Sequence, residues 1–549
     1  MVLVSLLPLA WLVPNHYQPW PSAWQDGTAL LLLFGAAAFA KRRAVFPALW
    51  VAAIGVTAVS VSLQWMTGRI DFGGDALMVL FYVGAFALSL AIGATLPGLQ
   101  GEVRVSALEW VAFVTAMSAI ASVGIALVQW TGSLSLGIWG ADLPSGARPF
   151  ANVAQPNHLS TLAFLGVCGL LLLREAARIG SAGFWAGTSY LLIGMVLTAS
   201  RTGWVQMAAF VVLALLFQRR TASQVRAAHV AGLVLIYVAA TLAWPKINEM
   251  LLLSGGRGVM QQIEGGARVP LWLALLDAVG REPWWGYGWQ QVAAAQQAVA
   301  LDHPPIQRHF EHSHNIVLDL LLWAGVPAGG TIVVFCAGAL VLQVRALRDP
   351  RALWLFAAAL GIILHGMLEL PLQYAYFLLP MGVALGAANA LSAAGPQVRC
   401  GVWGIRLSGM VGLALLTSIA VEYLEAEQSH RLLRLESARI GTARIASTAP
   451  DLRLLTQLKG LLEFARTQAR PAMSTAEVDE MRKVARRYPF PSAMLRSALV
   501  AGLNGRPAEA RLTLAQICSM HPTARCDEAR ESWLTLQTRY PVLFNVPLP

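Results

Sequence analysis

The sequence predicts an all-α, polytopic membrane protein with about 13 transmembrane helices and a separate C-terminal helical domain. Hydrophobic residues make up 56% of the chain and charged residues only 13%, against about 25% in a typical soluble protein. Apolar segments recur through residues 1–423 near the length of about 20 residues that a membrane-spanning helix needs. In residues 424–549 charges become frequent and apolar residues recur at helical spacing, which indicates a helical domain outside the membrane.

Twelve segments are apolar enough, and long or nearly long enough, to cross a bilayer. They are residues 27–40, 44–63, 76–96, 107–128, 157–173, 183–199, 203–217, 228–244, 314–341, 352–370, 376–395 and 407–422. Residues 1–13 form a further apolar segment that is too short to span unaided. This segment is either tilted into the interface or preceded by further residues. Counting it gives 13 spans.

Basic residues gather on alternate connections between these segments. The clusters are Lys41 to Arg43, Arg174 with Arg178, Arg219 with Arg220 and Arg226, Arg345 with Arg348 and Arg351, and Arg399 with Arg406. Because basic residues are retained on the cytoplasmic side, this pattern predicts a cytoplasmic N-terminus and an external C-terminal domain. The long loop 245–313 then faces outward. The formal net charge of +11 follows from the cytoplasmic loops and does not indicate nucleic-acid binding.

The most unusual polar cluster lies where the segment 314–341 begins. It contains Glu311, His312, His314 and Asn315, none of which a membrane span requires. At the N-terminus of a helix the helix dipole disfavours imidazolium, so we expect His314 to be a neutral base near pH 7. Such a base accepts a proton from a hydroxyl nucleophile. The alternative is a histidine that caps the helix or binds a lipid headgroup.

Other polar residues stand at the outer ends of predicted spans. Arg201 lies in a tight external turn over residues 200–202, and Arg268 lies in the long loop. Guanidinium groups suit phosphate oxygens in charge and geometry, so both arginines are candidate phosphate ligands. The alternative interpretation of Arg201 is a charge that anchors the turn to lipid headgroups, and that of Arg268 is a solvated charge in a long loop. Gln155, Asn157 and His158 mark another helix start, where they bind substrate or simply cap the helix.

The same residues exclude several function classes. The loop histidines His303, His309, His312 and His314 lack the i, i+4 spacing of a helical zinc site, so we expect no metal and no cofactor. The chain has no Asp-x-Asp for a metal-bound sugar nucleotide. A secondary transporter, a remote alternative, places ionisable residues near the bilayer midplane, whereas here they lie at helix ends on one face.

The C-terminal segment carries two further features. Asn504 to Ala510 indicates a helix end, a tight turn and a new helix, as in one tetratricopeptide-type hairpin, although no repeat period supports an array. Cys518 and Cys526 are the only cysteines of this segment and are separated by a predicted helix junction. An oxidising compartment closes such a pair into a disulfide, and the alternative is two reduced, buried thiols.

Taken as a set, these motifs resemble a known family. The pattern His314-Asn315-x9-Gly325-x3-Gly329 is similar to the signature of the O-antigen ligase/polymerase superfamily, and Ser200 to Gly203 and Arg268 to Trp289 are similar to its two arginine regions. Three further features resemble PglL-type bacterial protein O-oligosaccharyltransferases. They are Asn15-His16-x-x-Pro19, Gln155-Pro156-Asn157-His158 and Glu369-x-Pro371-Leu372-x-Tyr374-x-Tyr376. Leu370 stands where many relatives have an aromatic residue, which leaves open which tyrosine of this turn matters.

The resemblance implies a multi-pass enzyme of the bacterial inner membrane with its active site and C-terminus in the periplasm. Such enzymes transfer a preassembled oligosaccharide from undecaprenyl pyrophosphate to serine or threonine of a periplasmic protein such as pilin. It implies His314 as the catalytic base and Arg201 and Arg268 as ligands of the donor pyrophosphate. Supporting roles fall to Gln155, Asn157, His158, Asn315, Glu369 and Tyr374. The alternative within the superfamily is an O-antigen ligase that transfers the glycan to lipid A-core.

Overall fold

A computed structural model describes residues 3, 6–98, 106–144, 146–251, 253, 268–438 and 448–548 of the chain. Of the described residues, 73% are in helices and 2% in strands, so the predicted helical class is confirmed there apart from one small sheet. Parts of four predicted features lie outside the described residues. These parts are residues 1, 2, 4 and 5 of the first apolar segment, residue 145 of the predicted external loop 129–156, residues 252 and 254–267 of the loop 245–313, and residues 439–447 and 549 of the C-terminal domain.

The chain divides into two compact units. Unit 1 comprises Met1–Gly55, Phe81–Glu264 and Val334–Thr417, and unit 2 comprises Val56–Leu80, Gly265–Val333 and Ser418–Pro549. Four helices contain the boundaries and contribute residues to both units: α3 (Ala48–Met66), α4 (Gly73–Thr95), α13 (Ile316–Ala346) and α16 (Val402–Ser437).

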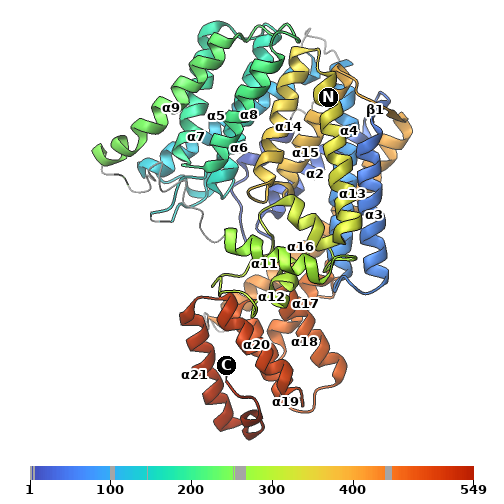
Figure 1. The fold of residues 1–549 in the computed structure, drawn as a ribbon, viewed down its shortest axis with the longest axis vertical. Coiled ribbons are helices and arrows are strands. Elements are labelled where there is room, and N and C mark those ends of the chain that lie inside the picture. Colours follow the sequence, from blue (N-terminus) through green and yellow to red (C-terminus); the bar gives the residue numbers. More distant parts are fainter. Residues whose placement is uncertain are drawn as a thin grey trace. The chain divides into compact units, whose positions relative to one another are not determined.

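Unit 1 is built mainly from apolar helices around α6. Its elements are η1 (Leu7–Leu12), α2 (Ala23–Ala38), β1 (Ala44–Pro47), η2 (Leu96–Gly98), α5 (Ala107–Thr131), η3 (Gly137–Trp139), α6 (Pro156–Glu175), α7 (Ser181–Leu197), α8 (Arg201–Phe217), α9 (Ala227–Met250), α14 (Pro350–Gly366), η4 (Pro371–Gln373), α15 (Ala375–Leu391) and β2 (Gln397–Cys400). Helix α6 packs against α5, α7, α8 and α14 (Figure 1). In the most apolar stretch of α6, 89% of the residues are buried, so α6 is a core helix. Its first turn is held by the neighbouring helices.

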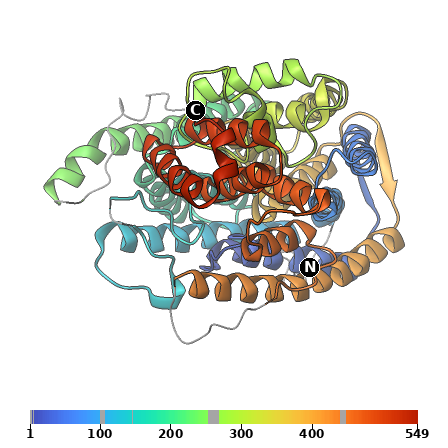
Figure 2. The ribbon, with the colours of Figure 1, turned by 90° about the horizontal axis from the view of Figure 1, so that it is seen from below.

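Unit 2 contains the helices of the predicted external loop and of the C-terminal segment. They are α11 (Arg268–Arg281), α12 (Val292–Val299), α17 (Thr456–Arg466), α18 (Thr475–Arg487), α19 (Pro491–Leu503), α20 (Pro507–Met520), α21 (Thr523–Arg539) and η5 (Pro541–Asn545). Consecutive helices from α18 to α21 lie side by side (Figure 2). Asn504 and Gly505 form the predicted turn between α19 and α20, and Pro507 occupies the first turn of α20.

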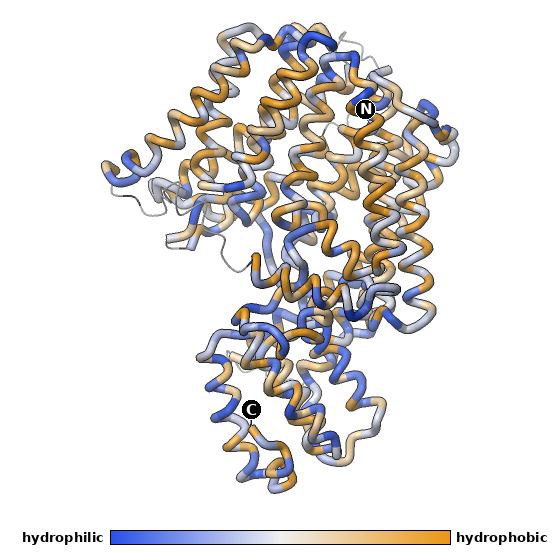
Figure 3. Tube along the Cα trace, viewed as in Figure 1, coloured by the Kyte–Doolittle hydropathy of each residue, from blue (hydrophilic) through white to orange (hydrophobic). Residues whose placement is uncertain are grey.

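All twelve predicted apolar segments coincide with helices, although their lengths differ. Among the described residues, seven helices are long and apolar enough to cross a membrane, and four more apolar helices have 10–17 residues. Figure 3 shows the hydrophobic residues concentrated along these helices, whereas α17 to α21 mix hydrophobic and hydrophilic residues. The chain is therefore a multi-pass membrane protein, and the count of 13 spans stays a prediction.

Two local expectations were wrong. Residues Leu7–Leu12 of the first apolar segment form a short 3-10 helix instead of an α-helix. Residues Ala44–Pro47, expected within a helix, form a strand that pairs antiparallel with Gln397–Cys400. Proline at position 47 and the β-branched and aromatic residues at positions 45 and 46 favour an extended backbone over a helix start.

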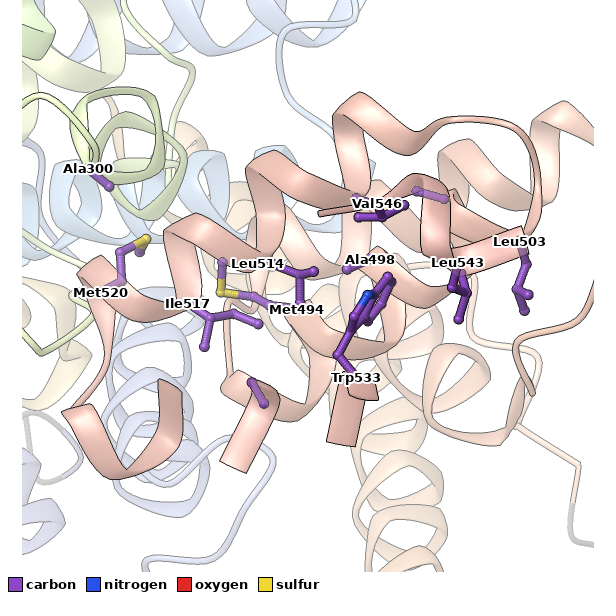
Figure 4. Close-up of a cluster of buried hydrophobic side chains, with 13 residues drawn as sticks. Ala300, Met494, Ala498, Leu503, Leu514, Ile517, Met520, Trp533, Leu543 and Val546 are labelled. Atoms are coloured by element: carbon purple, nitrogen blue, oxygen red, sulfur yellow. The ribbon is translucent and has the colours of Figure 1, made fainter. Parts of the chain in front are cut away.

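The C-terminal helices enclose their own hydrophobic core (Figure 4). Trp533 of α21 is fully buried and packs with residues of α19, α20 and η5, among them Ala498, Leu514 and Leu543. Cys518 and Cys526 are joined by a disulfide, with Cα atoms 4.6 Å apart, so the bonded alternative for this pair is the one observed.

Candidate functional site

In unit 1 the polar residues at the start of α6 converge on Glu369. Gln155 stands directly before α6 and Asn157 lies in its first turn, whereas Glu369 follows the C-terminal end of α14. The amide nitrogens of Gln155 and Asn157 donate to the two carboxylate oxygens of Glu369 at 3.3 and 3.0 Å. Glu369 is 7% exposed, so the contact is a buried carboxylate held by charge-assisted hydrogen bonds.

Asn157 also binds the start of α8, where Arg201 lies. The Ser200 hydroxyl donates to Asn157 Oδ1 at 2.7 Å and accepts from the Thr202 backbone amide at 3.2 Å, which makes Ser200 the cap of α8. The turn is shifted from the predicted residues 200–202, because α7 ends at Leu197 and Arg201 is already helical. Arg201 is therefore presented at a helix N-terminus, where backbone amides and the helix dipole favour an anion.

Arg148 steadies this turn from the other side. Its guanidinium donates to the carbonyl oxygens of Thr198 and Ala199 at 3.0 and 3.1 Å, at the C-terminal end of α7. Arg148 was not among the site residues predicted from the sequence. An arginine next to a proline in a predicted external loop does not by itself distinguish a positioning residue from a solvated one.

His158 lies against both tyrosines of the 369–376 turn. Its ring centroid is 4.9 Å from that of Tyr374 and 6.3 Å from that of Tyr376. Tyr376 is 2% exposed, whereas Tyr374 is partly exposed. Of the two tyrosines, Tyr374 is therefore the more exposed.

The N-terminal loop packs onto the segment that leads into α6. His16 Nε2 lies 2.7 Å from the carbonyl oxygen of Asn152, and the Asn152 side-chain amide donates to the carbonyl oxygen of Leu12 at 2.9 Å. Burial lowers the pKa of His16, so its ring stays neutral at pH 7. The three sequence features similar to PglL-type enzymes thus meet around the start of α6.

Asp26 is a further residue of this network that the sequence analysis missed. It is 1% exposed and accepts hydrogen bonds from the Ser22 hydroxyl and from the backbone amide of Ala375, both at 2.6 Å. Through the second bond Asp26 fixes the start of α15, directly after Tyr374. In the sequence, the feature that could have pointed to Asp26 is a lone aspartate directly before the apolar segment 27–40.

In unit 2, His314 stands directly before the helix cap of α13. Asn315 Oδ1 accepts from the backbone amides of Val317 and Leu318 at 3.0 and 3.2 Å, so Asn315 is the residue that caps the helix. His314 has a positive φ of 59°, which is uncommon for a residue other than glycine and is often found at functional sites. The ring of His314 lies 5.5 Å from that of Phe310.

Hydrogen bonds on both sides of His314 hold this backbone. The Ser313 hydroxyl accepts from the Asn315 amide at 3.2 Å, and the Ser313 amide donates to Asp319 Oδ1 at 2.7 Å. Trp272 Nε1 donates to the Ser313 carbonyl oxygen at 2.8 Å. Because Trp272 lies one turn after Arg268 on α11, the helix that begins with Arg268 also supports His314.

His312 is a structural neighbour of this segment. Its side chain is 13% exposed, and its Nδ1 lies 3.8 Å from Asp319 Oδ2. Burial, with the Arg487 guanidinium nearby, lowers the pKa of His312 to about 3. At pH 7 this imidazole is therefore neutral.

The glycines of the His314-Asn315-x9-Gly325-x3-Gly329 pattern have clear steric roles. α13 consists of two helical pieces that meet at Gly325, where φ is 73° and ψ is 172°. A Cβ on Gly325 would lie 2.4 Å from the Trp284 carbonyl oxygen, and one on Gly286 would lie 2.4 Å from the Leu322 carbonyl oxygen. Gly329 packs equally closely, because its Cβ would lie 2.4 Å from the Leu320 carbonyl oxygen. This kink changes the predicted span 314–341, since the first piece of α13 is separated from the piece after Gly325.

The candidate residues thus form two groups, one in each unit. In unit 1, Glu369 accepts hydrogen bonds from Gln155 and Asn157, and the ring of His158 packs against that of Tyr374. Arg201 follows Ser200, which donates a hydrogen bond to Asn157. His314, Asn315 and Arg268 belong to unit 2. In the part of the chain that is described, no three His, Cys, Asp or Glu side chains are arranged to hold a metal ion.

Two protein-family models match regions of the chain that include residues of both groups. Residues 186–333 match the family described as "O-Antigen ligase", and residues 353–534 match "Virulence factor membrane-bound polymerase, C-terminal". A "General O-oligosaccharyltransferase" of Acinetobacter baylyi is 27% identical over 532 residues, covering 94% of this chain and 91% of the relative. The chain is similar to PglL-type O-oligosaccharyltransferases within the O-antigen ligase/polymerase superfamily.

A second relative supports the assignment. The "ComP-specific O-oligosaccharyltransferase" of the same organism is 28% identical over 241 residues, covering 44% of this chain and 43% of the relative. No solved structure matches the chain. Both relatives are named as O-oligosaccharyltransferases, which supports a glycosyltransferase activity for this chain.

Proposed function

We propose that this protein transfers a preassembled oligosaccharide from undecaprenyl pyrophosphate to a serine or threonine hydroxyl of a periplasmic protein such as a pilin. The relatives named as O-oligosaccharyltransferases support a lipid-linked glycan donor and a protein acceptor. The observation that carries the assignment of the base is the constrained backbone of His314, which presents an imidazole beside a helix N-terminus without using it as the cap.

The proposed reaction is a direct displacement at the anomeric carbon. His314 takes the proton of the acceptor hydroxyl as its oxygen bonds to the anomeric carbon. The bond between that carbon and the pyrophosphate oxygen breaks, and both bonding electrons leave with the pyrophosphate. Arg201 and Arg268 stabilise the negative charge of this leaving group. The step balances without a metal ion.

In unit 1 the proposal assigns positioning roles to the network around Glu369. The start of α8, which carries Arg201, is held in place by Gln155, Asn157 and Glu369, and Tyr374 contacts the substrate. The roles of the arginines and of His314 predict two different defects. Loss of an arginine weakens use of the donor, whereas loss of His314 removes the proton acceptor and leaves donor binding intact.

The test uses His314→Ala with His303→Ala as its control. His303 lies in the same external loop and pairs with Asp277 at 2.9 Å, so its loss leaves the His314 backbone contacts unchanged. In cells that make a lipid-linked glycan and a pilin acceptor, the first variant is expected to yield no glycosylated pilin and the second to retain transfer. Near-normal transfer by a well-expressed His314→Ala protein contradicts the role of the base.

The same cells distinguish the alternatives. Glycan on lipopolysaccharide instead of pilin identifies an O-antigen ligase. Reporter fusions test the orientation, because a fusion after Pro549 is expected to be active only in the periplasm and one at Arg220 only in the cytoplasm. The reverse result would invert the proposed topology.

A further inference from the structure

The outer face of α11 is apolar where a water-exposed helix would be polar. Val269, Leu273 and Leu276 are 56%, 60% and 54% exposed, and Gly280 continues the same row. The spacing i, i+4, i+7 and i+11 places these residues on one stripe of the helix. The opposite face, with Leu271, Ala274, Leu275 and Ala278, is buried. α11 is therefore apolar on two faces.

The charged residues of α11 lie beside the exposed stripe and not on it. Arg281 pairs with Asp277 at 2.6 Å and with Asp302 at 2.8 Å, and Asp277 also contacts His303. Arg268 is the first residue of the helix. Polar flanks beside an apolar stripe are typical of a helix that lies in the plane of a membrane–water interface.

Two tryptophans extend this surface beyond the end of α11. Trp284 and Trp285 are 74% and 53% exposed. Tryptophan is enriched at the level of lipid headgroups, because its ring is apolar and its N–H is polar. An apolar stripe followed by two exposed tryptophans thus has the composition of a segment that lies in the membrane–water interface.

The backbone ties this segment to the start of a membrane span. The Val326 amide donates to the Pro283 carbonyl oxygen at 2.7 Å, and Gly325 packs against the backbone of Trp284. After the Gly325 kink, α13 continues as an apolar helix. Only 22% of the residues in the most apolar stretch of α13 are buried. Pro283 and Trp284 are therefore held beside the start of this exposed, apolar piece of α13.

We propose that α11 with Trp284 and Trp285 lies in the membrane–water interface on the side where the second piece of α13 begins, at Val326, with its stripe of Val269, Leu273 and Leu276 against lipid. This placement holds Arg268 at the depth of the headgroups. If the proposed function is correct, that is also the depth of a lipid-linked pyrophosphate. The partner of this surface is the bilayer and not a second protein.

The test introduces a photo-reactive side chain into the full-length protein in lipid nanodiscs. Leu273→benzoylphenylalanine and Leu276→benzoylphenylalanine probe the stripe, and Arg281→benzoylphenylalanine probes the flank of the same helix. Irradiation is expected to give phospholipid adducts, seen by mass spectrometry, at positions 273 and 276 and only background at position 281. Adducts to a second copy of the chain or to acceptor protein, or equal lipid yields at all three positions, overturn the proposal.

A second measurement uses the unmodified protein and does not depend on transfer activity. Hydroxyl-radical footprinting in nanodiscs compares Leu273 with Phe544 of the C-terminal helices, which are 60% and 65% exposed. Lipid contact is expected to protect Leu273 and to leave Phe544 reactive. Equal modification of the two residues contradicts lipid contact even where glycan transfer is normal, and protection with no transfer separates this proposal from the proposed function.

Discussion

Asn157 donates a hydrogen bond from its amide nitrogen to Oε1 of Glu369 at 3.0 Å, while its amide oxygen accepts from the Ser200 hydroxyl at 2.7 Å. One side chain therefore joins the starts of α6 and α8 to the turn after α14. Only a carboxamide supplies a donor and an acceptor in this geometry, because a carboxylate at pH 7 accepts but does not donate.

Asn157→Asp is expected to weaken transfer strongly, because it places two carboxylates against each other in a buried site. A buried group left without its partner costs about 1–3 kcal/mol. Combining it with Glu369→Gln is expected to restore part of the activity, since the new carboxamide at position 369 can donate to position 157 and accept from Gln155. Initial rates of glycan transfer for both single variants and the double variant measure this coupling. Strictly additive losses would contradict a direct Asn157–Glu369 contact.

The two tyrosines of the neighbouring turn are expected to differ. Tyr374→Phe removes a phenol from a partly exposed ring and is expected to lower the transfer rate without changing protein stability. Tyr376 is 2% exposed, so Tyr376→Phe is expected to leave transfer near normal. Transfer rates at equal amounts of folded protein decide between them. A larger loss for Tyr376→Phe would reverse the assignment.

Adjacent glycines in α13 provide a steric test. A Cβ at position 329 meets the Leu320 carbonyl oxygen at 2.4 Å, whereas one at position 330 meets nothing within 4 Å. Gly329→Ala is expected to destabilise the protein by about 1–3 kcal/mol through overpacking. Gly330→Ala is expected to be neutral or to stabilise it by up to about 1 kcal/mol, because alanine favours the helix. Thermal unfolding of both variants in the same detergent makes the comparison, and equal melting temperatures would contradict the steric role.

The sequence allowed the apolar helices to be predicted well, because a run of apolar residues near span length has few other uses in a chain with so few charges. Helix ends were less predictable. Arg201 was placed in a turn and is helical, because Ser200 caps α8 and the helix begins two residues before the predicted start at residue 203. The strand Ala44–Pro47 depends on pairing with Gln397–Cys400, a contact across more than 300 residues that local hydropathy does not encode.

Most residues of the candidate site could be predicted from the sequence, but the contacts between them could not. His314, Gln155 and Asn157 stood out because polar residues at the ends of apolar segments are costly without a purpose, and Glu369 stood out through the family resemblance. That Asn157 would bind both Glu369 and Ser200 follows only from the packing of α6, α8 and α14. Asp26 and Arg148 were missed for the same reason, since each acts on the backbone of a distant segment.

The Cys518–Cys526 disulfide gives a prediction for the C-terminal helices. Non-reduced protein is expected to show this one bond by peptide mass spectrometry. Closing so short a loop stabilises by about 2–3 kcal/mol in the chain-entropy model, so Cys518→Ser with Cys526→Ser is expected to lower the melting temperature. Cys400→Ser, which removes a free thiol, is the control and is expected to change little. Alkylatable thiols at both 518 and 526 in untreated protein would contradict the bond.

His521 makes the stability of the protein depend on pH. Its Nε2 donates to the Pro489 carbonyl oxygen at 2.9 Å, and burial together with the nearby His309 lowers its pKa to about 4. The unfolded chain binds a proton at this position below about pH 6.5, whereas the folded protein does not until about pH 4. The contribution is therefore fully present above pH 6.5 and is lost as the pH falls towards 4, by at most about 1.4 kcal/mol per pH unit. His521→Gln keeps a donor for Pro489 but does not titrate, so its melting temperature is expected to fall less between pH 7 and pH 5 than that of the unmodified protein. Parallel pH profiles for the two proteins would show that His521 is not the titrating group.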